Sequence, residues 1–188
     1  MGLAEGGLVR WDPVPRVSNT LVVACGALAR EISMLRRVNG WRHLTVQCLP
    51  ADFHNHPDRI ADSVDRKLTA GRGVFESMFV AYAECGTRGR LDAVLDKHGV
   101  ERLPGDHCYG FFAGRELFAA LADEEPGTFY LTDFLVRHFD RLVIRGLGID
   151  RHPELEEAYF GNYRRLVYLA QVEDDRLLNR AKAAARRL

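Results

Sequence analysis

Hydrophobic residues in the first half of the chain fall into short runs that are separated by turn residues. Three of these runs are rich in β-branched and aromatic residues, as buried β-strands are, and they span residues 20–25, 43–48 and 77–85. After each run, apolar residues recur at helical spacing, over residues 27–40, 56–71 and 89–99. The pattern therefore predicts three strands, each followed by a helix.

This alternation predicts a parallel sheet, because parallel neighbours need crossover connections and helices are the usual crossover. The second half adds a helix over 114–127, a strand over 128–133, a helix over 133–148 and a long helical stretch over 153–188. The predicted fold class is α/β, with a three-layer, mostly parallel (Rossmann-like) sheet and a helical C-terminal segment. We expect a single domain over 1–188, with a flexible head over 1–19 and C-terminal helices over 151–188 packed on the domain.

Length and charge narrow the range of partners. A chain of 188 residues can bury one continuous core without help from disulfides. Its 26 basic and 26 acidic side chains give a formal net charge of zero, so there is no overall field to attract nucleic acid or an anionic membrane. We therefore expect neither as a partner, and a small molecule instead.

The N-terminal residues carry no charged segment followed by an apolar one, which a secretory signal peptide requires. No segment approaches the ~20 apolar residues of a membrane span. The sequence therefore predicts a cytoplasmic location, where thiols are normally kept reduced. In that setting the four cysteines point to metal binding, catalysis or plain burial before disulfides.

Three of the cysteines close a predicted strand. Cys25, Cys48 and Cys85 each stand at the carboxyl end of such a run, and Cys108 lies in the loop PGDHCYG. Ligands of open α/β sheets bind outside the carboxyl ends of the strands, so these thiols are expected at one edge. Thiolates gathered there are good ligands for zinc or an iron–sulfur centre.

Two observations weigh against a shared metal site. No C-x-x-C pair is present, and free cysteine often serves as a small buried hydrophobe. Cys48 is the one most readily explained by packing, because its strand can continue the apolar run. Among the histidines in adjacent loops, His54 is a better candidate ligand than His56, which can simply order the turn before the helix.

Two further side chains are candidates for handling protons near such a site. Asp133 follows the predicted strand over 128–133 and so faces the same crevice, although an Asp there is also a common helix N-cap. His107 directly precedes Cys108 and could complete a mixed site or support it.

Six stretches together resemble a known bacterial and archaeal family. They are VACGALAREI, LPADFHNHPDRI, YAECGTRGRL, PGDHCYG, GTFYLTDFL and YFGNYRRLVYLAQ. They resemble the domain-of-unknown-function family sixteen thirty-eight, whose members are often associated with corrinoid-dependent methyltransferase systems. The resemblance implies a setting of one-carbon metabolism, with a corrinoid protein or methyltransferase as partner. It also implies that Cys25, Cys85, Cys108 and the His54-Asn55 step are the family's motif residues, and it leaves Cys48 outside them.

These inferences combine into one hypothesis. Zinc held by Cys25, Cys85, Cys108 and His54 would bind and activate a substrate thiol or another small donor in corrinoid-linked methyl transfer, with His107 and Asp133 supporting it. Two alternatives stay open: an iron–sulfur cluster that supplies electrons for corrinoid reactivation, and a non-catalytic accessory module with a structural metal. A thiol redox enzyme is disfavoured by the missing C-x-x-C. The sequence does not establish that the protein is an enzyme.

Overall fold

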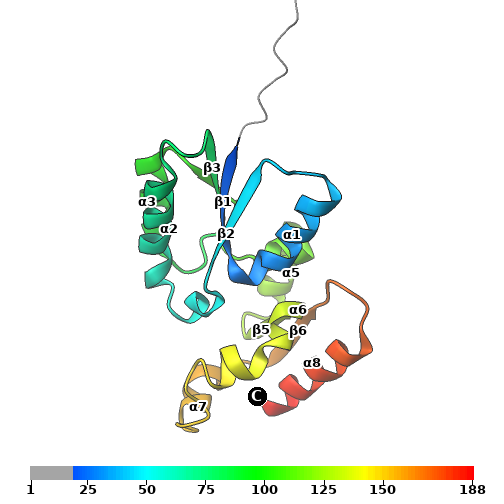
Figure 1. Ribbon diagram of the computed structural model, residues 1–188. Helices are drawn as coiled ribbons and strands as arrows, with labels where there is room; N and C mark the ends of the chain where they lie inside the picture. The colour runs from blue at the N-terminus through cyan, green and yellow to red at the C-terminus, as the bar shows by residue number, and fades with distance from the viewer. Residues whose placement is uncertain (1–18) are drawn as a thin grey trace, which may run out of the picture.

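A four-stranded parallel sheet forms the centre of the first half of the molecule (Figure 1). The computed structural model describes residues 19–188, so the flexible head predicted over residues 1–19 lies outside it apart from its last residue. The strands run in the order β2-β1-β3-β4, and their bounds are β1 (Thr20–Cys25), β2 (Leu44–Leu49), β3 (Ser77–Ala81) and β4 (Glu101–Arg102). Every neighbouring pair is parallel, which confirms the predicted α/β fold class.

Helices cover both faces of this sheet (Figure 1). They are α1 (Ala29–Val38), α2 (Asp58–Gly71) and α3 (Arg90–His98). Side chains alternate along a strand, so Leu21 and Val23 face α2 and α3, whereas Val22 and Ala24 face α1. All four are buried, because a parallel sheet that is covered on both faces is apolar on both.

The second half contains a smaller parallel sheet of two strands, β5 (Thr128–Thr132) and β6 (Arg165–Leu169). Its remaining elements are short helices, namely α4 (Tyr109–Ala113), α5 (Arg115–Glu124), α6 (Asp133–Arg137), the π-helix η3 (Asp140–Ile144), α7 (Leu155–Phe160) and α8 (Asp175–Arg187). Two 3-10 helices in the first half, η1 (Gly26–Leu28) and η2 (Ala51–Asn55), follow β1 and β2. None of the helices within residues 19–188 is long and apolar enough to cross a membrane.

The second half differs from the sequence-based expectation in its pairing. The strand expected over 128–133 forms as β5, but it pairs with β6 and not with the main sheet. Strand β6 lies inside the stretch over 153–188 that was expected to be helical throughout, although α7 and α8 do flank it as helices. Leu166 and Tyr168 of β6 pack on the core beside Leu131, so tertiary packing decides the conformation here over local helical spacing.

The first half differs in one boundary. The strand expected to reach Cys85 ends at Ala81. Its pairing with β4 ends with Val80, which lies opposite Arg102. The residues that follow leave the sheet in an extended conformation and then turn at Cys85, whose φ of 53° is left-handed. Cys85 therefore lies in a loop beyond the sheet edge.

The second half is joined to the carboxyl edge of the main sheet. The side-chain amide of Asn55, at the end of η2, donates to the carbonyl oxygen of Leu142 in η3 over 2.9 Å. Tyr109 and Phe112 of α4 pack against the core of the first half, and the ring of Tyr109 also packs on Tyr130 of β5, with a centroid separation of 5.5 Å. These contacts hold β5 and α6 opposite the ends of β1 and β3.

The contact between α2 and the sheet sets the stability of the first half. Leu68 is fully buried, so replacing it with Ala should lower the free energy of unfolding by about 2–5 kcal/mol. The matched change Leu117→Ala, on a side chain that is 56% exposed, should alter it by no more than about 0.5 kcal/mol. Urea titration of both variants measures this, and equal midpoints would contradict the assigned core.

Candidate functional site

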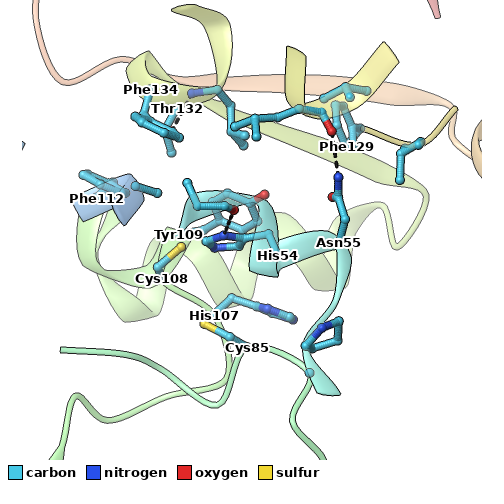
Figure 2. Close-up of a pocket in the computed structure, with 18 residues that line it drawn as sticks. His54, Asn55, Cys85, His107, Cys108, Tyr109, Phe112, Phe129, Thr132 and Phe134 are labelled. Carbon is cyan, nitrogen blue, oxygen red and sulfur yellow. Dashed lines mark hydrogen bonds between the residues drawn. The ribbon is translucent and has the colours of Figure 1, made fainter. Parts of the chain in front are cut away.

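A cavity of about 370 Å³ lies between the carboxyl edge of the main sheet and the second half (Figure 2). In the strand order β2-β1-β3 the connections leave β1 and β3 on opposite faces of the sheet, and ligands of open α/β sheets bind at such a switch point. The polar and sulfur-bearing residues of the lining are His54, Asn55, Cys85, His107, Cys108 and Thr132. The structure thus brings four residues singled out from the sequence, His54, Cys85, His107 and Cys108, to one cavity.

Cys25 lies beside this lining, as the last residue of β1. It is 2% exposed, and its Sγ accepts a hydrogen bond from the backbone N–H of Ala27 over 3.3 Å. Burial raises the pKa of the Cys25 thiol to about 11. A thiol at this position stays protonated at neutral pH unless a cation replaces its proton.

Cys48 stands apart from the other cysteines. It pairs with Ala24, whereas Cys25 pairs with Leu49, so the two-residue period of the strands places Cys48 on the opposite face of the sheet. Its side chain is exposed and does not line the cavity. The expectation that Cys48 is a packed core residue is therefore wrong, although it is separate from the cluster as the family resemblance implied.

The loop after β3 positions Cys85 through the side chain of Glu84. That carboxylate accepts hydrogen bonds from the backbone N–H groups of Gly86 (2.8 Å) and Gly89 (3.2 Å) and from the hydroxyl of Thr87 (2.7 Å). The backbone N–H of Cys85 donates to the carbonyl of Asp106 over 2.8 Å. These bonds fix the turn and hold the loop that carries Cys108 against Cys85.

Cys85 and Cys108 both line the cavity, and each affects the ionisation of the other. The neighbouring Cys108 thiol lowers the pKa of Cys85 to about 7 against the opposing effect of burial. The neighbouring Cys85 thiol, together with burial, raises the pKa of Cys108 well above its usual value. Of the two, Cys85 is the one that ionises first in the metal-free protein.

The imidazole of His54 lies beside the thiol of Cys25, with Nδ1 and Nε2 at 3.8 and 3.9 Å from its Sγ. Nδ1 also lies 2.9 Å from the carbonyl oxygen of Ala51, and because a carbonyl only accepts, Nδ1 is the donor in that bond. In the neutral imidazole, Nε2 then keeps its lone pair. Histidines that bind metals are oriented in this way, with the other ring N–H given to a carbonyl or carboxylate.

His56 follows η2 and does not line the cavity. Its backbone N–H donates to the carbonyl of Phe53 over 3.0 Å. This bond does not involve the imidazole, so the role of His56 in ordering the turn before α2 stays a prediction.

Sequence reasoning missed Tyr82, which lies beside Cys25. The residue is 1% exposed, and its hydroxyl makes no hydrogen bond of ordinary geometry. Burial and the neighbouring Cys25 thiol raise the pKa of Tyr82 far above its usual range. The strand period could have found it, because Val80 pairs with Val23 and the residues two further along, Tyr82 and Cys25, share that face.

Asp133 does not line the cavity. It is 2% exposed, and its Oδ1 accepts from the hydroxyl of Tyr168 (2.7 Å) and from the backbone N–H of Gln171 (3.1 Å). These bonds join the start of α6 to the end of β6. The helix N-cap is Thr132 and not Asp133, since the Thr132 hydroxyl accepts from the N–H of Leu135.

Asp133 is therefore held in a structural network, and the position expected to face the crevice is taken by its neighbours Thr132 and Phe134. Of the two residues predicted to handle protons, only His107 lines the cavity.

The donor atoms are neighbours but do not surround one point. Within residues 19–188, no three His, Cys, Asp or Glu side chains stand in a ready-made metal-binding arrangement. Cys25 approaches His54, and Cys85 approaches Cys108, as two adjacent pairs. Binding of one ion by all four would require side-chain rotation, for which the exposed His54 has room.

Comparison with known proteins places the chain in a family. A family model described as "Protein of unknown function (DUF1638)" matches residues 48–188. The chain belongs to this family. The match confirms the resemblance noted from the sequence motifs, and DUF1638 covers His54, Cys85 and Cys108 but begins after Cys25. No curated protein and no solved structure matches the chain.

The interaction between Cys85 and Cys108 sets the order in which the thiols react. In metal-free protein, iodoacetamide should modify Cys85 through neutral pH, whereas Cys48, whose pKa is raised from its usual value by desolvation, should react only in more alkaline solution. Mass spectrometry of the alkylated peptides across pH measures both profiles. Cys108→Ala should move the Cys85 profile to higher pH and leave that of Cys48 unchanged. A Cys85 inflection at or above that of Cys48 would contradict the assigned influence of Cys108 on Cys85.

Proposed function

We propose that this DUF1638 protein binds a transition metal, with zinc favoured, through Cys25, Cys85, Cys108 and His54. The observation that carries the proposal is the convergence of three thiols and one imidazole with a free Nε2 at the switch point of the sheet. Thiolate and imidazole are the ligands that zinc prefers. The hydrogen-bond donors beside Cys25 also fit a metal site.

Two hydrogen-bond donors beside Cys25 are better suited to a negatively charged thiolate than to a neutral thiol. The N–H of Ala27 already points at its Sγ, and the hydroxyl of Tyr82 is buried beside it without a partner. A metal-bound thiolate carries negative charge and accepts both bonds, which removes the cost of the unsatisfied hydroxyl. The cation also offsets the burial that otherwise keeps Cys25 protonated.

The function proposed for the metal is activation of a thiol or other small donor ligand that enters the cavity and takes a position on the metal that is left open or is exchangeable. A bound zinc lowers the pKa of such a group and holds it as a nucleophile at neutral pH. His107, which lines the cavity, would take up or return the proton. A thiolate is the form that accepts a methyl group, so this chemistry fits the corrinoid-linked methyl transfer that the family resemblance implies, with a corrinoid protein or methyltransferase as partner.

Metal analysis with cysteine variants tests the proposal. Protein purified without oxygen should hold about one zinc per chain, and Cys25→Ser, Cys85→Ser and Cys108→Ser should each lose it. Cys48→Ser is the matched control and should keep its metal, because Cys48 lies on the opposite face of the sheet. Circular dichroism establishes that each variant remains folded.

The same preparations distinguish the alternatives. Iron with equimolar sulfide and a brown colour would overturn zinc in favour of an iron–sulfur centre. Absence of stoichiometric metal from folded wild-type protein, before and after incubation with Zn²⁺, would overturn the metal site altogether. Metal that is lost equally from the Cys48→Ser control would contradict the assigned ligand set.

The role of Tyr82 gives a second, independent test. Tyr82→Phe should weaken zinc binding by roughly tenfold, because the Cys25 thiolate loses a hydrogen-bond donor. Tyr130→Phe is the matched control, since its hydroxyl is also buried without a partner but belongs to the aromatic cluster of Tyr109 and Phe118. Competition with a zinc chelator measures both affinities, and equal effects of the two changes would contradict the role of Tyr82.

A further inference from the structure

The cavity has two chemically different walls (Figure 2). Cys85 and His107 lie on one side of the view, and Phe129, Thr132 and Phe134 lie on the other. The sulfur-bearing wall comes from loops at the carboxyl edge of the main sheet, whereas the apolar wall comes from α4, β5, α6 and η3. A ligand in this cavity therefore meets soft donors at one end and hydrocarbon at the other.

The apolar wall is built from aromatic and branched side chains. Its members are Phe112, Phe129, Phe134, Leu135, Leu142 and Val143. Leu142 and Val143 are part of the buried core of the second half, and the Asn55 bond to the Leu142 carbonyl fixes this segment over the cavity. The wall is therefore preformed, as small-molecule sites usually are.

The lining offers no counter-charge to an ionic ligand. Among the described residues that line the cavity, none is Lys, Arg, Asp or Glu. A phosphate, sulfonate or carboxylate held against the aromatic wall would lose its hydration without an ion pair in return, which is costly. The volume of about 370 Å³ is at the small end of the range for ligand sites, about 300–1,000 Å³.

We propose that the ligand is a small, neutral molecule with a thiol head and an aromatic or branched apolar body. The thiol faces Cys85 and His54, and the body fills the wall formed by Phe129, Phe134 and Leu135. This inference rests on the proposed function for its head group, because the thiol is recognised by the bound metal. The apolar body is recognised by the cavity itself.

Three matched probes separate these two parts in isothermal titration calorimetry. They are 4-methylbenzenethiol, which has both features, 4-methylphenol, which lacks the sulfur, and 4-mercaptobenzoate, which adds a charge to the body. On protein whose zinc content has been verified, 4-methylbenzenethiol should bind at least about tenfold more tightly than either of the others. Equal affinity of 4-mercaptobenzoate would overturn the neutral body, and equal affinity of 4-methylphenol would overturn the thiol head.

A variant of the apolar wall provides the structural control. Among the aromatic side chains of residues 19–188, Phe134 packs only against the ring of His138, with centroids 4.6 Å apart, and it lines the cavity. Phe134→Ala should weaken 4-methylbenzenethiol by about tenfold and leave zinc content unchanged. Leu117→Ala, on an exposed helix position away from the cavity, should leave both unchanged. Unchanged affinity in Phe134→Ala would overturn the assigned wall.

Failure of the ligand class and failure of the metal site give different results. If zinc is bound but the charged probe is accepted as well as the neutral one, the ligand class falls and the metal site stands. If no metal binds, 4-methylphenol and 4-methylbenzenethiol should bind with similar affinity, because only the apolar wall then recognises them. That result would contradict both the metal site and the recognition of a thiol, and it would leave the recognition of an apolar body by the cavity wall intact.

Discussion

The structure depends on the parallel pairing of β1 with a neighbour on each side. Parallel strands need crossover helices, and here the connections after β1 and β3 leave the sheet on opposite faces. The two connections therefore diverge at the carboxyl ends of β1 and β3, and a crevice opens between them that none of the helices described in the first half fills. Cys25, η2 and the Cys85 loop all lie at this crevice because each stands at the carboxyl end of one of the three strands or soon after it.

Alternation along the strands then selects which side chains enter the site. Cys25, Leu49 and Tyr82 share the face that packs on α2 and α3, whereas Cys48 is displaced by one residue and so lies on the other face. This arrangement has a local cost, because the hydroxyl of Tyr82 is buried beside Cys25 without a hydrogen-bond partner. Buried polar groups that lack a hydrogen-bond partner and lie beside a preformed crevice are typical of functional sites.

Much of the first half could be predicted from the sequence, because its strands and helices follow local periodicity and their alternation requires parallel pairing, whereas the strand order was not predicted. The second sheet could not, since β6 becomes a strand only through its partner β5 and the core around Leu131. The site was partly predictable for the same reason: strand ends gave Cys25 and Cys85, but the partnership of Tyr82 with Cys25 needs the register of β3 on β1. The burial of Asp133 likewise depends on β6, through Tyr168 and Gln171.

The Glu84 carboxylate has a consequence for the kind of cofactor chemistry that this scaffold can support. In doubly wound proteins the turn between a strand and the next helix commonly offers its free amides to a nucleotide's phosphates. Here the backbone amides of Gly86 and Gly89 already donate hydrogen bonds to the Glu84 carboxylate, which takes the place that a phosphate would occupy. The turn after β3 therefore offers neither amide to a phosphate, and the cavity beside it is lined by the Cys85 side chain.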